Sequence, residues 1–236
     1  MIKLCGLMKT TLLDYPGKVA CTVFTGGCNL RCPFCHNAEL LDMTLPAAYT
    51  EEEILAFLQK RQRQLEGVVI SGGEPTLQAE LPDFLRSIRE KTNLKIKLDT
   101  NGTNPRMLAK LLEEGLLDYA AMDIKAGPHG YARLCGVTEE ALHLSAIAES
   151  RALLLSGKIP YEFRTTVVDG LHMEADFAEI GPWIKGCKQY YLQAFRDSDN
   201  VLNRKAGYRT PKKETLLHYA ALTAPYVGTV SLRGVD

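Results

Sequence analysis

The sequence predicts an α/β protein in which six strand–helix units form a partial, open (β/α)6 barrel. Runs rich in β-branched and aromatic residues alternate with helical patterns along most of the 236 residues. This alternation is typical of a parallel sheet with helices outside it, either curved or open and doubly wound. Six units are too few for a closed eight-stranded barrel, and a gap would admit a large substrate from the side.

Each predicted strand is a short apolar or β-branched run that ends at a glycine or polar turn. The strands are expected at residues 19–24, 67–70, 94–98, 119–123, 161–168 and 189–194. Each predicted helix has apolar residues at helical spacing, with a capping box at Thr50–Glu53 for the first and Pro105 in the first turn of the third. The helices are expected at about 51–58, 81–90, 105–112, 138–155, 173–185 and 212–222.

The composition is that of one globular domain, which we expect to span residues 1–236 with a core of about 18–224. The chain is 46% hydrophobic, and its 28 basic and 28 acidic residues cancel. Neutral charge gives no sign of nucleic-acid binding, and no apolar run reaches the length of a membrane span. No secretory signal is evident, and seven cysteines in an uneven distribution suit a reducing cytoplasm better than a disulfide framework.

Three of the cysteines, Cys28, Cys32 and Cys35, lie within eight residues at the end of the first predicted strand. Their spacing is C-x3-C-x2-C, and three thiolates on one loop indicate a metal or cluster site. Closed zinc and iron–sulfur sites take four protein ligands. A four-iron cluster with three ligands would leave one iron open to a ligand that is not protein.

Two other interpretations of this loop stay open. The run from Cys32 to His36 also matches C-x-x-C-H, the attachment pattern of c-type haem, but that leaves Cys28 without a role. A structural zinc site would need a fourth ligand, either His36 or a distant cysteine. His36 directly follows Cys35, so both could reach one tetrahedral ion only with strain.

Three further polar loops follow the next three strands. They are Gly72-Gly73-Glu74-Pro75, Asp99-Thr100-Asn101-Gly102 and Asp123-Ile124-Lys125. Each alone is an ordinary turn or surface pair. Together with the cysteine loop they mark one face of the sheet, because the carboxyl ends of parallel strands share one edge. Four such loops favour an enzyme.

The residue types in these loops are ones that can contact a charged ligand. Glycines let backbone approach closely, Glu74 could pair with an ammonium group, and Lys125 could pair with a carboxylate. Arg164 lies in an otherwise apolar strand, so we expect it to contact the ligand or a carboxylate inside the barrel. Cys21 is expected in the core, and no role is evident for Cys5, Cys135 or Cys187.

The four motifs together resemble those of radical S-adenosylmethionine (radical SAM) enzymes that activate glycyl-radical enzymes. Residues 28–37 match the C-N-x-x-C-x-x-C-H-N loop of those activases, and the other three loops match their G-G-E-P, D-T-N-G and D-x-K motifs. The opening residues 9–18 are most similar to activating proteins of anaerobic ribonucleoside-triphosphate reductase. The resemblance covers residues 9 to about 195.

The resemblance implies a [4Fe-4S] cluster on Cys28, Cys32 and Cys35 and a bound S-adenosylmethionine (SAM). The residues that we accordingly expect near SAM are Phe34, His36, Asn37, Gly72, Gly73, Glu74, Asp99, Thr100, Asn101, Asp123 and Lys125, together with Arg164 from the buried-charge argument above. It also implies a monovalent cation at Asp99 and Asp123. A histidine that contacts ribose in formate-lyase activases has no counterpart here, and Gln193 is the residue offered in its place. No second cysteine cluster for an auxiliary domain is present.

The implied reaction is reductive cleavage of SAM to methionine and a 5'-deoxyadenosyl radical, which takes a hydrogen atom from a glycine of a larger partner enzyme. Flavodoxin or ferredoxin is the expected electron donor. One alternative is a radical SAM enzyme that acts on a small molecule, such as a deazapurine synthase. The other is a non-catalytic iron–sulfur or zinc protein, which would not need the Glu74 and Asp99 loops.

Overall fold

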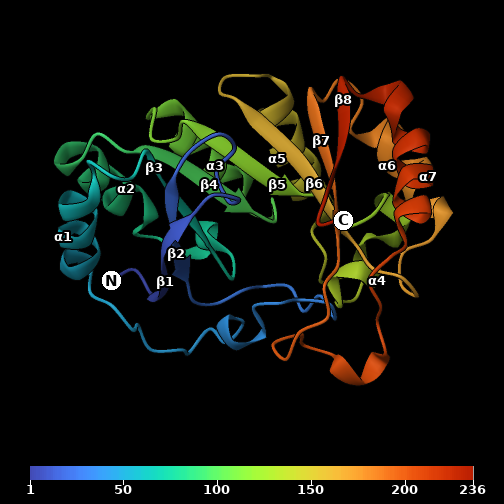
Figure 1. Ribbon diagram of the computed structural model, residues 1–236, viewed down its shortest axis with the longest axis horizontal. Coiled ribbons are helices and arrows are strands. Elements are labelled where there is room, and N and C mark those ends of the chain that lie inside the picture. The colour runs from blue at the N-terminus through green and yellow to red at the C-terminus, as the bar shows by residue number, and fades with distance from the viewer. Residues whose placement is uncertain (236) are drawn as a thin grey trace.

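The computed structural model describes residues 1–235 and contains one eight-stranded sheet, in which the strands follow one another in sequence order (Figure 1). The strands are β1 Leu4–Thr11, β2 Ala20–Thr25, β3 Gly67–Gly72, β4 Lys95–Thr100, β5 Tyr119–Asp123, β6 Tyr161–Val167, β7 Gln189–Ala194 and β8 Thr229–Arg233. From β2 to β8 all neighbouring pairs are parallel, and β1 is antiparallel to β2. Strands β1 and β8 are the two edges, so the sheet is an open barrel.

The six predicted strands correspond to β2–β7, which confirms the partial barrel. The two edge strands were missed. Strand β1 carries three consecutive exposed residues, and Gly6 interrupts its apolar pattern. It therefore has no continuous apolar run from which a strand could be predicted. Strand β8 is five residues long and has no buried residue, because an edge strand needs no continuous apolar face.

Seven helices accompany the strands in residues 1–235. They are α1 Glu51–Arg61, α2 Leu81–Lys91, α3 Pro105–Glu113, α4 Tyr131–Cys135, α5 Leu144–Leu155, α6 Glu174–Trp183 and α7 Lys213–Thr223. The capping box at Thr50 is present, since its side chain accepts from the Glu53 amide and Glu53 returns the bond. No helix in these residues has the length and apolar character that a bilayer crossing requires.

Two helical predictions need correction. Helix α5 begins at Leu144, six residues later than the predicted 138, because Thr138 starts a turn: its carbonyl accepts from the Leu142 amide at 3.0 Å. The short helix α4 was not predicted, since five residues are too few for a periodic pattern to emerge.

The two faces of the sheet differ in chemistry. Outward-facing residues such as Ile70, Leu98 and Phe163 are fully buried in the main apolar core, beneath the helices. The residues between them point into the barrel and include buried charges, among them Lys97, Asp99 and Glu162. A small apolar plug of Tyr15, Ala20 and Val69 is separate from the main core. The interior of the barrel is therefore mainly a polar chamber.

Candidate functional site

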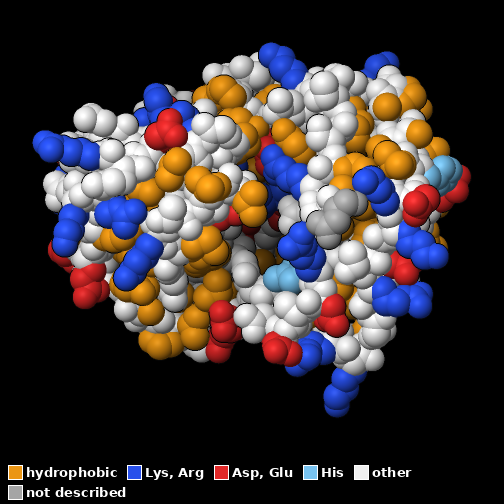
Figure 2. Space-filling view, viewed as in Figure 1, with side chains coloured by type: hydrophobic (Ala, Val, Ile, Leu, Met, Phe, Trp, Pro, Cys, Tyr) orange, Lys and Arg blue, Asp and Glu red, His pale blue; other side chains and the backbone are white. Residues whose placement is uncertain are grey.

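A cavity of about 810 Å³ occupies the interior of the barrel and its carboxyl-end loops. Figure 2 shows the hollow at the centre of the molecule, with basic side chains gathered on one side of it. All sixteen residues singled out by sequence line this cavity: Cys28, Cys32, Phe34, Cys35, His36, Asn37, Gly72, Gly73, Glu74, Asp99, Thr100, Asn101, Asp123, Lys125, Arg164 and Gln193. Segments as far apart as the loop after β2 and strand β7 thus contribute to one site.

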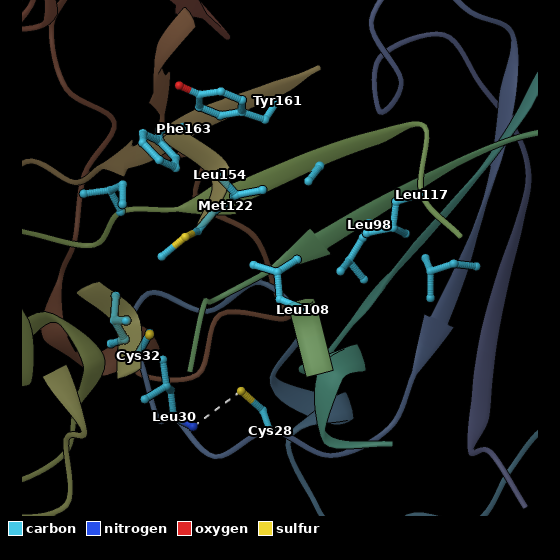
Figure 3. Close-up of a cluster of buried hydrophobic side chains, with 14 of the residues drawn as sticks. Cys28, Leu30, Cys32, Leu98, Leu108, Leu117, Met122, Leu154, Tyr161 and Phe163 are labelled. Atoms are coloured by element: carbon cyan, nitrogen blue, oxygen red, sulfur yellow. Dashed lines mark hydrogen bonds between the residues drawn. The ribbon is translucent and has the colours of Figure 1, made fainter. Parts of the chain in front are cut away.

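The cysteine loop lies over the carboxyl ends of the strands. Cys28 Sγ accepts hydrogen bonds from the Leu30 amide at 3.4 Å and from Asn101 Nδ2 at 3.8 Å, the first of which is drawn in Figure 3. Cys28 and Cys32 are buried and Cys35 is half-buried. N–H groups directed at sulfur stabilise a thiolate, which is the form that binds iron.

The thiols differ in acidity. Burial raises the pKa of Cys28 to about 11. A hydrogen bond from the thiol of Cys135 lowers the pKa of Cys32 to about 7, against the opposite effect of burial. Cys135 is the last residue of α4, and its carbonyl accepts from the Arg31 amide at 2.9 Å, so this helix end lies directly against the cysteine loop. Cys135 belongs to no cysteine motif, and nothing in the surrounding sequence predicts its contact with Cys32.

The chain after β7 anchors the cysteine loop from the opposite side of the cavity. The Leu202 amide donates to the Cys35 carbonyl at 3.0 Å, and the Asn203 amide donates to the Pro33 carbonyl at 2.9 Å. His36 Nε2 lies 2.6 Å from the Arg196 carbonyl oxygen, and the His36 ring is 5.0 Å from that of Phe195. We call residues 195–203 the strap.

The two glycines after β3 serve chain packing. Gly72 has φ +123°, and a Cβ there would lie 2.3 Å from the Thr25 carbonyl oxygen. A Cβ on Gly73 would lie 2.2 Å from the Gly27 carbonyl oxygen, just before Cys28. The cysteine loop and the glycine loop are therefore in backbone contact, which a side chain at either position would disrupt.

Glu74 is fully buried and already has four hydrogen bonds. Its Oε1 accepts from the Thr76 amide, the Thr76 hydroxyl and the Thr100 hydroxyl at 3.1, 2.6 and 2.7 Å, and Oε2 accepts from the Asn101 amide at 2.6 Å. Burial raises the pKa of Glu74 in spite of these bonds. The carboxylate thus joins the loops after β3 and β4. The expected pairing of its side chain with an ammonium group gains no support from this arrangement.

A network of charges crosses the interior from β4 to β6. Arg164 Nε is 2.6 Å from Asp123 Oδ1, and Arg164 Nη2 is 3.3 Å from Asp99 Oδ2. Lys125 Nζ is 2.8 Å from Asp123 Oδ2, and Lys97 Nζ pairs with Asp99 Oδ1. The expectation that Arg164 contacts a carboxylate inside the barrel is therefore confirmed, with two carboxylates.

Opposite charges decide the ionisation of this network. Burial would raise the pKa values of Asp99 and Asp123, but Arg164 and the neighbouring lysines outweigh it and lower both. Burial would lower the pKa of Lys125, and Asp123 reverses that effect. Asp99, Asp123, Lys125 and Arg164 are therefore all charged at neutral pH.

The donor set fits an iron–sulfur cluster with an open iron. Three thiols from one loop face a cavity that is large, polar and built from glycine loops and charged side chains. Within residues 1–235, no group of three or more His, Cys, Asp or Glu side chains gathers around a point suited to a single metal ion. His36, one candidate for the fourth ligand of a zinc ion, is instead held by the strap, whereas a distant cysteine, Cys135, does contact Cys32.

Several cavity residues were missed by sequence reasoning. Leu13 and Asp14 come from the loop after β1, Thr166 from β6, Arg196 from the strap and Arg233 from β8. Three of them, Leu13, Asp14 and Arg233, depend on edge strands that were not predicted. Arg233 also makes a two-pronged pair with buried Glu162 at 2.8 and 2.9 Å and lies over the Tyr191 ring at 3.4 Å. No motif signals these positions.

Comparison with protein families and known proteins agrees with this geometry. A family model described as the Radical SAM superfamily matches residues 22–172. A Methanocaldococcus jannaschii protein, provisionally named a glycyl-radical enzyme activating enzyme, is 27% identical and covers 98% of this chain and 95% of its own. The pyruvate formate-lyase-activating enzyme of Streptococcus mutans is 29% identical, over 79% of this chain and 74% of its own.

A 7-carboxy-7-deazaguanine synthase from Methanothermobacter thermautotrophicus is 32% identical, over 44% of this chain and 40% of its own. Among solved structures, a radical SAM methyltransferase from Sphaerobacter thermophilus superposes with a TM-score of 0.73 at 19% identity, over 95% of this chain and 68% of that one. The structure of SuiB from Streptococcus suis bound to S-adenosylmethionine superposes with a TM-score of 0.66 at 13% identity, over 88% of this chain and 48% of that one. At these identities the superpositions bear on the fold alone.

Proposed function

The chain belongs to the radical SAM superfamily, and from that premise we propose that it generates a glycyl radical on a larger partner enzyme. The observation that carries this proposal is how much of each chain the alignments with known proteins cover. The relative named as an activating enzyme aligns over nearly the whole of both chains, whereas the deazaguanine synthase aligns over less than half of either. The small-molecule alternative is correspondingly less well supported.

The residues of the cysteine loop suit the family's cofactor. Cys28, Cys32 and Cys35 would hold the [4Fe-4S] cluster, with the Leu30 and Asn101 N–H groups stabilising the Cys28 thiolate. When bound, the cluster supplies the electron for reductive cleavage of SAM to methionine and a 5'-deoxyadenosyl radical. The fold holds the cysteine loop in place through the strap on one side and α4 on the other.

The cavity offers complementary groups to each end of SAM. Lys125, 14% exposed, faces the cavity and suits the methionine carboxylate, while the Gly73 carbonyl accepts no hydrogen bond within residues 1–235 and suits the ammonium. Phe34, His36 and Asn37 would border the adenine, and Gln193 the ribose. Asp99, Asp123 and Arg164 would orient these groups through the charge network, while Thr100 and Asn101 hold Glu74 in place.

The substrate is proposed to be a glycine in a loop of the partner, most suitably anaerobic ribonucleoside-triphosphate reductase, with flavodoxin or ferredoxin as the electron donor. The open edge of the barrel between β1 and β8 supports a loop of a folded protein as the substrate, because such a loop can enter there. The choice of this reductase rests on the resemblance of residues 9–18. Water and oxygen must be excluded while the radical exists, and the entering loop itself would close the cavity.

Electron paramagnetic resonance of the candidate partner tests this proposal. Loaded protein, dithionite and SAM should produce a glycyl-radical doublet on the reductase, and the doublet should collapse when the partner carries glycine deuterated at Cα. Cleavage of SAM without any radical on this or another glycyl-radical enzyme would contradict the activase assignment and favour a small-molecule substrate.

A further inference from the structure

One buried charge in the barrel lies outside every motif considered above. Lys97 is on β4, two residues before Asp99, so both side chains point to the inner face of the sheet. Lys97 is fully buried and does not border the cavity, and its ammonium group pairs with Asp99 Oδ1. Lysine is almost never fully buried unless it is paired, so this position calls for a specific role.

The pairing leaves no carboxylate oxygen of the network without a cationic neighbour. Asp99 contacts Lys97 through Oδ1 and Arg164 through Oδ2, at 3.3 Å for the second. Asp123 contacts Arg164 through Oδ1 at 2.6 Å and Lys125 through Oδ2 at 2.8 Å. A sodium or potassium ion between the two carboxylates would add a fourth positive charge beside two negative ones, which Coulomb repulsion disfavours.

We propose that the Lys97 ammonium group is a built-in replacement for a monovalent metal cation beside Asp99. It keeps Asp99 ionised and oriented toward the cavity, so that ligand binding needs neither Na⁺ nor K⁺. Lys97 is a positioning residue, since it reaches the cavity only through Asp99. The identity of the ligand as SAM rests on the proposed function, and the role of Lys97 within the charge network does not.

Charge counting shows why the ammonium matters. Three cations, Lys97, Lys125 and Arg164, face two carboxylates, so the network has one surplus positive charge. That surplus matches a single ligand carboxylate. Replacing Lys97 with methionine removes the surplus and leaves Asp99 Oδ1 without a cation, which creates the site that a small metal ion can enter.

Thermal unfolding of the cluster-free chain tests this directly. The melting temperature is measured in KCl, NaCl and tetramethylammonium chloride at equal ionic strength, since tetramethylammonium is too large for the site. Wild type should melt at the same temperature in all three salts. Lys97→Met should melt at least about 2 °C higher in KCl or NaCl than in tetramethylammonium chloride.

Lys95→Met is the matched control, because Lys95 is on the same strand but is exposed and pairs with Asp118 at the surface. It should show the salt response of wild type. Two results would overturn the proposal: a Na⁺- or K⁺-specific rise in wild type, or a folded Lys97→Met without one. If Lys97→Met fails to fold, Lys97→Gln takes its place. The melting temperatures of wild type in the three salts remain a separate test, because a rise specific to Na⁺ or K⁺ would overturn the proposal without any variant.

Equilibrium binding of SAM to the cluster-loaded protein gives a second readout. Wild type should bind equally well in KCl and tetramethylammonium chloride, and Lys97→Met should bind at least about tenfold more weakly in the latter, because a buried charge has lost its partner. KCl should restore most of that affinity. Equal SAM affinities of Lys97→Met in both salts would contradict the proposal that the Lys97 ammonium group replaces a metal cation. Absence of SAM binding in every salt would instead contradict the proposed function, and the melting comparison would still decide the role of Lys97.

Discussion

Glu74 illustrates how a motif residue can serve the architecture of a site. Its four hydrogen bonds join the loops after β3 and β4, and the side chain has no exposed surface. Oε1 already accepts three bonds, so a direct ligand contact through this carboxylate would fall on Oε2, which accepts one. The residue's place in the site is therefore structural first.

Glu74→Gln tests this assignment. The amide NH₂ would face either the Asn101 amide or the three donors at Oε1, so a buried donor would lose its acceptor. We expect the free energy of unfolding, measured in urea, to fall by about 1–3 kcal/mol. Glu90→Gln, on an exposed surface of α2, should have no effect. Unchanged stability together with weaker SAM binding would identify Glu74 as a ligand contact.

His172 makes stability depend on pH in the mildly acidic range. The ring is buried, Nδ1 accepts from the Val168 amide at 3.1 Å, and Nε2 lies 3.1 Å from the Lys125 carbonyl oxygen. Burial lowers its pKa to about 4 from 6.5. Because the unfolded chain takes up this proton at higher pH than the folded chain does, stability is lost as the pH falls from 6.5 toward 4.

The expected loss over that range is about 3 kcal/mol of unfolding free energy from this one group. Urea titrations of wild type and His172→Gln at pH 7 and pH 4.5 measure it. The difference between the two proteins should shrink at the lower pH, since the glutamine binds no proton. Parallel pH profiles would show that folding does not lower the pKa of His172.

The strap is the element that ties the cysteine loop to the far side of the barrel. Two backbone hydrogen bonds and the His36 contact join it to the run from Pro33 to His36. Since the cysteine loop lacks regular secondary structure from residue 26 to 37, these bonds limit its motion. Retention of a metal cluster should depend on them.

His36→Phe keeps a ring beside Phe195 and removes the bond to the Arg196 carbonyl. Loss of one hydrogen bond of about 1 kcal/mol corresponds to roughly fivefold faster release of iron to a chelator from the loaded protein. His129→Phe, at an exposed position, should release iron at the wild-type rate. Equal rates for all three proteins would show that the strap does not restrain the cysteine loop.

Strand β8 is attached by a buried charge. Arg233 reaches across Tyr191 of β7 to Glu162 of β6, which is fully buried. Arg233→Met would leave that carboxylate unpaired and should cost about 3–5 kcal/mol of unfolding free energy. The double variant with Glu162→Gln should regain most of the loss. Additive losses in the double variant would mean that the two residues stabilise the protein independently.

At the scale of the molecule, the sequence was informative where the pattern is repeated or the motif is dense. Alternating β and α signals predicted β2–β7 and the open barrel, and the motifs led to sixteen residues that share one cavity. It was silent where contacts are non-local. The Cys135–Cys32 contact and the strap depend on how distant segments pack, and no local spacing encodes them.

The motifs also named residues without revealing their partners. Nothing in Asp-Thr-Asn-Gly shows that a lysine two residues earlier neutralises its aspartate, or that Glu74 is held by Thr100. The monovalent cation expected at Asp99 and Asp123 stays a prediction that the four ion pairs of the network do not support. The kinds of group in the site could thus be predicted from residue types. Which charges pair with one another could be seen only in the folded structure.

Cleavage of SAM by the loaded protein is the most direct test of the central claim. The chain is reconstituted anaerobically with iron and sulfide, reduced with dithionite and assayed for 5'-deoxyadenosine. Wild type should form the nucleoside, Cys32→Ala should form none, and Cys21→Ala, which alters a buried cysteine of β2 away from the cavity, should behave as wild type. A well-formed cluster that yields no 5'-deoxyadenosine, with a spectrum that SAM leaves unchanged, would contradict the assignment.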